Sequence, residues 1–240
     1  MPGTVGEQDS TTMSRRASRA GATCAIAGSV LLFVGTYLHP MSADPNDALA
    51  AFTEYAADRL WIASHLTQLA GVALMVAALL VLTQQLETGK GRVWARIAAA
   101  SAIAGLAVAA ALQAVDGIAL RAMVKAWAAA APAEKAGIFH AAFAVRQVEI
   151  GLASMLSLSL GLTATVSGVA LLVDRTYPTW IAGLAIAGGV PTMIAGVVIA
   201  YTGFSALDMA INMPANSLLL VWMIVLGTFM WRRDDRHTGN

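Results

Sequence analysis

The chain contains six apolar segments that are each long enough to cross a membrane as a helix. A bilayer core about 30 Å thick requires about 20 helical residues, and these segments hold almost no ionisable side chain. Because unpaired backbone polar groups are costly in lipid, such segments cross a bilayer as helices. The sequence therefore predicts an all-α, polytopic membrane bundle of six transmembrane helices. The segments are residues 20–38, 60–82, 93–115, 150–173, 179–201 and 209–231.

These segments belong to one transmembrane domain, which we place at residues 20–231. Small side chains are dense within it, and in lipid such residues let helices pack closely. The segment 1–19 is polar and rich in Ser and Thr, and it is predicted to be a disordered cytoplasmic tail. Residues 232–240 form a second predicted cytoplasmic tail.

Positive charge is unevenly distributed among the predicted connections. Ten of the 15 Lys and Arg residues lie in the two tails and in the second and fourth connections, while the alternate connections hold the other five. Connections rich in Lys and Arg stay on the cytoplasmic side of a membrane. Both termini are therefore predicted to be cytoplasmic, in a multi-pass protein of the plasma (inner) membrane.

Two of the outer connections are predicted to contain helices of their own. Asp and Asn around Pro45 are helix-start signals, and they predict a short amphipathic helix over residues 48–58 with Phe52 and Tyr55 turned inward. Pro132 is typical of the first position of a helix. We therefore expect the third transmembrane helix to extend to Ala130 and the fourth to begin near Pro132.

Polar side chains gather at the outer ends of the predicted transmembrane helices. His65 and Gln68 lie three residues apart on one helix, and the next helix carries Gln113 and Asp116 at the same spacing, so each pair shares a helix face. Polar groups within a membrane are costly and face the bundle interior or a wet cavity. The sequence therefore predicts an outward-facing polar pocket centred on His65 and Asp116. Its predicted lining consists of His65, Gln68, Gln113, Asp116, Arg146, Glu149, Asp208, Asn212 and Asn216.

Several of these residues also have structural interpretations. Asp116 can form an ion pair with Arg146 or Arg121, and Arg146 can instead pair with Glu149 on its own helix. The two asparagines of the last helix are typical of hydrogen bonds between helices. These alternatives stay open at the level of the sequence.

Two histidines and a carboxylate are also candidates for a metal centre. His39 ends the first predicted helix at the level of His65, and with Asp116 or Glu149 they would supply a two-histidine, one-carboxylate ligand set. A transition metal, or a haem bound through His65, is therefore a candidate cofactor. No HxxxH or HxxE spacing supports this site, because its ligands lie on different helices.

The sequence leaves three functions open. The working hypothesis is a non-enzymatic binding or permease-like protein for a small molecule or a lipid. The alternatives are a metal- or haem-binding redox component and a structural or accessory subunit. GxSxG, HExxH and Walker motifs are absent, so no class of enzyme is indicated, and without a basic stripe no nucleic-acid binding is predicted. The expected partners are the lipid bilayer, a small-molecule or lipid ligand, and a second copy of the chain.

The first third of the chain carries a resemblance to known membrane proteins. The segments concerned are Tyr37-Leu38-His39-Pro40, Asp44-Pro45-Asn46-Asp47, Ala51-Phe52 with Tyr55-Ala56, and the pattern of Trp61, His65, Gln68 and Gly71. They resemble multi-helix membrane proteins of high-GC Gram-positive bacteria for which we know no activity. The resemblance implies a membrane helix bundle and draws attention to His39 and His65, and it implies no function.

Overall fold

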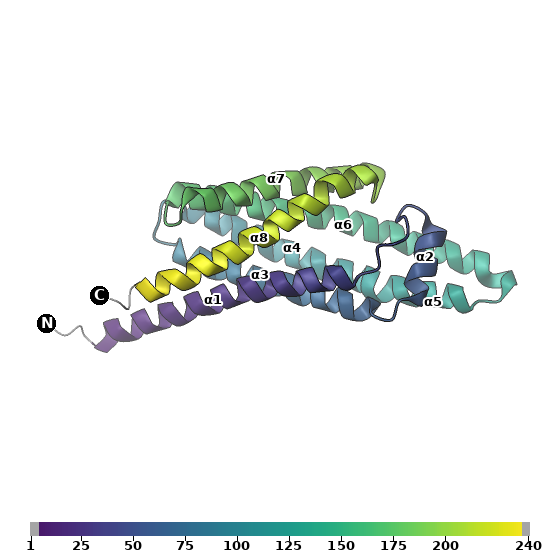
Figure 1. Ribbon diagram of the computed structural model, residues 1–240, viewed down its shortest axis with the longest axis horizontal. Coiled ribbons are helices and arrows are strands. Elements are labelled where there is room, and N and C mark those ends of the chain that lie inside the picture. Colours follow the sequence, from purple (N-terminus) through teal and green to yellow (C-terminus); the bar gives the residue numbers. More distant parts are fainter. Residues whose placement is uncertain (1–4, 237–240) are drawn as a thin grey trace.

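The computed structural model describes residues 5–236, and the side chains of residues 15–232. Six long helices lie side by side along the molecule (Figure 1), and each is long and apolar enough to cross a membrane. They are α1 (Val5–Leu38), α3 (Trp61–Gln85), α4 (Arg92–Gln113), α6 (Pro132–Asp174), α7 (Thr179–Thr202) and α8 (Ala206–Arg236). The short helices are α2 (Ala48–Ala57), the π-helix η1 (Ala114–Leu120) and α5 (Arg121–Ala129). The described residues contain no strand, so the predicted all-α polytopic bundle of six transmembrane helices is confirmed.

The first and last helices extend further toward the termini than the sequence predicts. Helix α1 begins at Val5, so residues 5–19 are helical where the sequence predicts a disordered tail. Helix α8 continues to Arg236, past the predicted end of its apolar segment at Trp231. Once a helix is nucleated, each further residue adds to it at little cost, and the polar residues simply continue the transmembrane helices. Residues 1–4 and 237–240 of the predicted tails lie outside the described residues.

The six long helices are arranged as a ring. Around the ring, each helix packs against the next in the order α1, α3, α4, α6, α7 and α8, and α8 packs against α1 to close the ring. The largest apolar cluster of the described residues includes Leu79, Ile181, Trp222 and Leu226. Leu79 lies toward the end of α3, Ile181 at the start of α7, and both Trp222 and Leu226 in the second half of α8. These parts of the helices lie on the side of the bundle that holds the termini (Figure 1). We call the opposite end, where α2 and α5 lie, the distal end.

Glycine lets α1 and α3 approach each other backbone to backbone. A Cβ atom on Gly71 would lie 2.6 Å from the backbone nitrogen of Leu32, and one on Gly28 would lie 2.7 Å from the carbonyl oxygen of Gly71. No side chain fits at either position unless the helices move apart. In lipid, where no hydrophobic effect drives helices together, such close packing supplies much of their attraction.

Gly71→Ala is expected to destabilise the bundle by about 1–3 kcal/mol, because the added methyl group overpacks the contact between α1 and α3. The melting temperature of the purified protein in detergent, followed by circular dichroism, measures this effect. Gly183→Ala in α7 is the matched control, since a Cβ atom there meets nothing within 4 Å. Alanine is favoured over glycine in a helix by about 1 kcal/mol, so equal stability of the two variants would contradict the prediction.

A second apolar cluster lies at the distal end, where α2 packs against α5 and α6. The Asp47 side chain caps α2 by accepting hydrogen bonds from two backbone nitrogens of its first turn. Phe52 and Tyr55 of α2 are buried, so the predicted helix and its inward face are confirmed. The other buried members of the cluster are Ala51, Trp61, Leu120, Val124, Trp127 and Ala142.

The third and fourth transmembrane helices extend well past the bilayer thickness. Helix α4 runs through η1 into α5, which ends at Ala129, and Pro132 opens α6, so both predicted boundaries are confirmed. Helix α6 has 43 residues, which at 1.5 Å per residue corresponds to about 65 Å, whereas a bilayer core is about 30 Å thick. Helix α5 and the first part of α6 therefore project from the distal end as a helical hairpin (Figure 1).

Candidate metal centre

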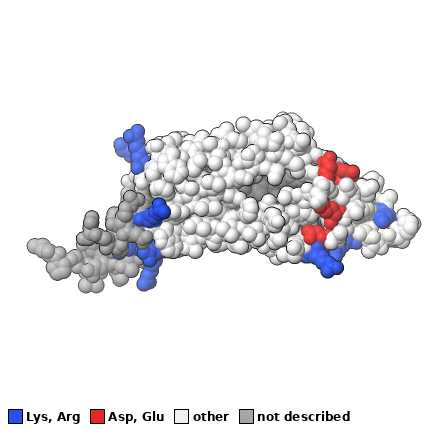
Figure 2. Space-filling view, in the orientation of Figure 1, with Lys and Arg blue, Asp and Glu red and all other residues white. Residues whose placement is uncertain are grey.

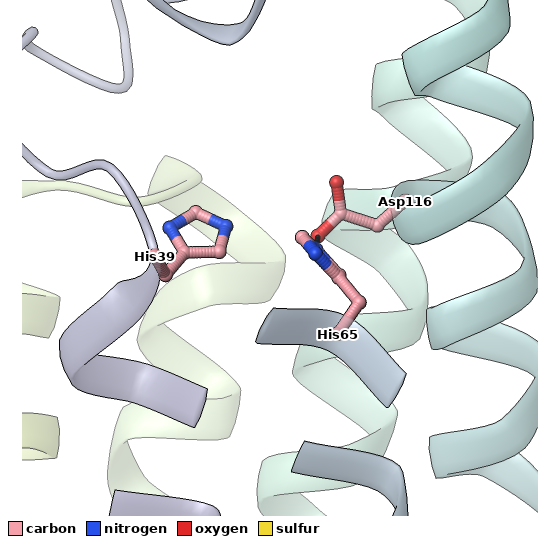
Figure 3. A group of neighbouring side chains, drawn as sticks. All are labelled: His39, His65 and Asp116. Carbon is pink, nitrogen blue, oxygen red and sulfur yellow. Dashed lines mark hydrogen bonds and ion pairs between the residues drawn. The ribbon is translucent and has the colours of Figure 1, made fainter. Parts of the chain in front are cut away.

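His39, His65 and Asp116 meet near the distal end of the bundle. Each offers one ligand atom, and these atoms lie within 4.8 Å of one another. Figure 3 shows the three side chains pointing toward a common point from three separate parts of the chain. His39 directly follows α1, His65 lies in the second turn of α3, and Asp116 belongs to η1. The structure thus brings together the three residues that the sequence analysis named as candidate metal ligands.

The π-helix η1 places Asp116 beside α3. One carboxylate oxygen, Oδ2, is 2.9 Å from Nε2 of His65, and the other, Oδ1, is buried without a hydrogen-bond partner among the described residues. The carbonyl of Asp116 accepts a hydrogen bond from the Trp61 indole nitrogen at 3.1 Å. Single-turn π-helices are rare and occur frequently at functional sites, and here the irregular turn carries the acidic residue of the cluster.

Close packing at Gly117 brings this turn against His65. A Cβ atom on Gly117 would lie only 2.8 Å from Cβ of His65. Glycine at this position therefore allows η1 to approach α3 closely enough for the carboxylate of Asp116 to reach the imidazole ring. Gly117 is a positioning residue that the polar pattern of the sequence did not reveal.

Both histidines use Nδ1 to bind a backbone carbonyl. Nδ1 of His65 is 2.6 Å from the carbonyl oxygen of Trp61, and Nδ1 of His39 is 2.8 Å from that of Pro40. A carbonyl oxygen only accepts hydrogen bonds, so each Nδ1 carries the proton and Nε2 is the atom left to act as a ligand. Metal-binding histidines are oriented in this way, with the second ring nitrogen donating to a carbonyl or a carboxylate.

Aromatic rings enclose the two histidines. The ring centroid of His39 lies 4.9 Å from that of Trp61 and 5.0 Å from that of His65, and Tyr55 packs on Trp61 at 4.3 Å. Burial lowers the pKa of His39, although the charges of Asp116 and Asp58 oppose the shift. The neutral imidazole, which is the form that binds metal, is therefore favoured for His39. Burial also raises the pKa of Tyr55 to about 12, so its phenol stays protonated.

Two glutamines lie one helical turn away from the cluster. Gln113 donates a hydrogen bond from Nε2 to Oε1 of Gln68 at 3.2 Å. Gln68 follows His65 by three residues on α3, and Gln113 precedes Asp116 by three residues. The two i,i+3 pairs noted in the sequence therefore face each other, one from α3 and the other from the end of α4 and η1.

Arg146 and Glu149 form a buried ion pair on α6. Their side chains are 2% and 6% exposed, and Nη1 of Arg146 lies 3.4 Å from Oε2 of Glu149. Arg146 also donates to the hydroxyl of Tyr55 at 3.2 Å and to the carbonyl of Pro45 at 2.7 Å. Of the pairings that the sequence left open, Arg146 thus forms the one with Glu149, and Asp116 pairs with His65.

The remaining predicted pocket residues form a separate stripe on α8. Asn216 donates to Oδ1 of Asn212 at 2.7 Å, and the backbone nitrogen of Asp208 donates to the hydroxyl of Ser205 at 3.2 Å. These bonds stay within α8 and the turn before it. The structure therefore divides the predicted pocket into a cluster around His65, a pair on α6 and a stripe on α8.

Trp61 is a site residue that the sequence analysis did not include. It contacts both histidine rings, and its carbonyl and indole nitrogen bind His65 and Asp116 respectively. The signal was present in the sequence, because Trp61 precedes His65 by four residues and residues at that spacing share a helix face.

The fold and the site define an integral membrane protein with a two-histidine, one-carboxylate cluster at the distal end of its helices. Comparisons of the chain with protein-family models, with curated proteins and with solved structures found no significant match. Its function is therefore inferred from the chemistry of the site.

Proposed function

We propose that this protein binds a divalent transition-metal ion through His39, His65 and Asp116. One observation carries the proposal: three ligand atoms lie within 4.8 Å of one another, and both Nδ1 protons are already donated to carbonyls. Nε2 of His65 and Oδ2 of Asp116 are 2.9 Å apart, a separation that either a shared proton or a metal ion can bridge. A metal ion would engage His39 as well and so satisfy all three ligands at once.

The ligand set favours an ion such as Zn²⁺ or Fe²⁺. Imidazole suits these metals, and two histidines with one carboxylate form a known set for non-haem iron. Mg²⁺ and Ca²⁺ prefer shells of oxygen ligands. A haem is disfavoured, because Nε2 of His65, the atom that would bind its iron, lies 2.9 Å from the Asp116 carboxylate. Three protein ligands leave a coordination position open for water or an external molecule.

The proposal is tested by titrating the chelator-treated, detergent-purified protein with Co²⁺, a coloured substitute for Zn²⁺. We expect visible ligand-field bands that saturate at one ion per chain and disappear when Zn²⁺ is added. Elemental analysis of the protein as purified gives an independent measure of bound metal. A protein that binds no Co²⁺, Zn²⁺ or Fe²⁺ stoichiometrically would contradict the proposal, and the cation would then be a proton shared by His65 and Asp116.

Gly117→Ala is expected to weaken Co²⁺ binding by about tenfold, within the range of effects seen for residues that orient metal ligands. The added Cβ would lie 2.8 Å from Cβ of His65, so η1 must shift and carry Asp116 away. Gly151→Ala is the matched control, because a Cβ atom there meets nothing within 4 Å. Co²⁺ titrations compare the two, and equal affinities would show that the close approach of η1 is irrelevant to the site.

We also propose that the site faces the outside of the plasma membrane and that both termini are cytoplasmic. Figure 2 supports this orientation, since Lys and Arg gather at the end that holds the termini, whereas Asp and Glu appear at the distal end together with further basic residues. In a Cys24→Ala background, Ala136→Cys at the exposed tip of the distal hairpin should react with an impermeant maleimide on intact cells. Lys90→Cys should react only after lysis, and the reverse result would invert the orientation.

The other functions compatible with the sequence are a binding or permease-like role for a small molecule or a lipid, and a structural role. A permease needs a path through the bundle, and the buried apolar residues Leu79, Trp222 and Leu226 belong to one packed cluster in the parts of α3 and α8 that are remote from the site. This arrangement supports binding at one face over passage. If the Co²⁺ titration fails while ligand screening raises the melting temperature, small-molecule binding becomes the better proposal.

A further inference from the structure

A groove of about 320 Å³ lies at the distal end on the side of α6 and α7, and none of the proposed metal ligands lines it. Its walls come from α6, from the C-terminal end of α7 and from the connection between α1 and α2. Phe143, Ile150 and Ile199 supply apolar surface, and Asn46 and Gln147 supply polar groups. The lining is therefore amphipathic, and it is built from segments far apart in the sequence.

Arg146 is the single charged residue among the described residues that line the groove. Its side chain is 2% exposed and held in place by the carbonyl of Pro45 and the hydroxyl of Tyr55. Its contact with the Glu149 carboxylate, at 3.4 Å, is longer than the 2.7–2.9 Å typical of a strong charge-assisted hydrogen bond. The guanidinium is thus fixed in position, and it is the residue of the lining with which an anionic group in the groove can interact.

The groove is continuous with a lipid-facing stripe on α7. Val190, Ile194, Val197 and Tyr201 follow one another at helical spacing and are 41%, 50%, 48% and 87% exposed, and Tyr201 also lines the groove. Helix α7 ends at Thr202, and tyrosine is enriched where transmembrane helices leave the hydrocarbon core. An acyl chain lying along this stripe would place its headgroup at the groove.

We propose that the groove binds the anionic phosphate headgroup of a membrane phospholipid, with the phosphate near Arg146 and the acyl chains along α7. A volume of about 320 Å³ is at the small end of ligand pockets, which suits a glycerophosphate headgroup whose chains remain outside. The apolar stripe favours a lipid over a free phosphate ester, because acyl chains along α7 would add apolar contacts that a soluble ester does not make. The proposal of a lipid site is independent of the proposed metal centre, because His39, His65 and Asp116 do not line the groove.

The proposal is tested by native mass spectrometry of the detergent-purified protein with added phosphatidylglycerol or phosphatidylcholine. We expect phosphatidylglycerol to bind at least about tenfold more tightly than phosphatidylcholine. Ala200→Trp should remove this preference by filling the groove, and Gln147→Glu should weaken it by placing a second negative charge in the lining. Ile103→Trp is the matched control, since Ile103 is an exposed residue of α4 that does not line the groove.

Three results would overturn the proposal. Equal binding of the two lipids would show that charge is not recognised. An undiminished preference in both Ala200→Trp and Gln147→Glu would place the lipid elsewhere on the protein. A rise in melting temperature with soluble glycerol 3-phosphate, without any preference between the two lipids, would identify a soluble phosphate ester as the occupant.

Discussion

His65→Ala is expected to abolish stoichiometric Co²⁺ binding, with a loss of affinity greater than about 100-fold, because even residues that only orient metal ligands contribute about 10- to 100-fold. His65 is 2% exposed and lies at the centre of the cluster, in contact with His39, Trp61 and Asp116. Alanine removes one of three ligands and leaves the other two on separate elements. Titration of the chelator-treated variant, followed by visible absorption and by calorimetry, measures the loss.

His140→Ala is the matched control, since His140 is an exposed residue of the distal hairpin and should leave the titration unchanged. Asp116→Asn keeps the shape of the side chain and removes its charge, so it should weaken binding less than His65→Ala does. Undiminished Co²⁺ affinity in His65→Ala would refute the assignment of the site. If the cluster were only a structural ion pair, His65→Ala would lower the melting temperature and Co²⁺ would not raise that of the native protein.

Arg146→Met is expected to destabilise the protein by about 3–5 kcal/mol, because it leaves the carboxylate of Glu149 buried without its partner. Glu149 is 6% exposed on the side chain, so water cannot easily replace the guanidinium. The substitution also removes the hydrogen bonds to Tyr55 and Pro45. The double variant Arg146→Met with Glu149→Leu should recover much of the loss, since a buried ion pair can often be replaced by apolar residues at little cost.

The exposed pair of Arg96 and Glu87 provides a matched control for this experiment. Its N–O distance is also 3.4 Å, but the two side chains are 53% and 50% exposed. Arg96→Met should therefore cost less than about 1 kcal/mol. Unfolding in mixed micelles with increasing denaturing detergent compares the variants. If Arg146→Met were as stable as Arg96→Met, burial of the α6 pair would not have the energetic effect that we assign to it.

The membrane helices could be predicted because lipid constrains them so strongly. Hydrophobic length alone located six spans, the Asp47 cap located α2, and Pro132 located the start of α6. The helical segment over residues 5–19 could not be predicted in this way. Its residues are polar, and hydropathy does not distinguish a polar helix that continues a transmembrane span from a polar tail.

For the candidate site, the sequence predicted only the depth in the membrane at which its residues lie. Depth along each helix, at a fixed rise per residue, placed His39, His65 and Asp116 near one leaflet. The rotation of each helix about its axis decides which of these side chains meet, and it depends on contacts of small residues such as Gly117 with its neighbour. The π-helix that carries Asp116 has no signature in the hydrophobic pattern. For the same reason, the sequence analysis included the residues of the α8 stripe in the predicted pocket: the rotation of α8 about its axis was unknown.

The segment of residues 39–46 between α1 and α2 has a kinetic consequence for the proposed metal centre. Two of the three ligands sit on continuous helices, whereas His39 lies on this connection, whose backbone nitrogens at Ser42 and Ala43 donate to the carboxylate of Glu54 at 3.0 and 2.9 Å. An ion held by all three ligands is released most readily when this segment detaches and withdraws one of them. The residence time of the ion is then governed by how often this segment leaves its contacts with Glu54 and Arg146, so side chains that never touch the ion set the rate of exchange.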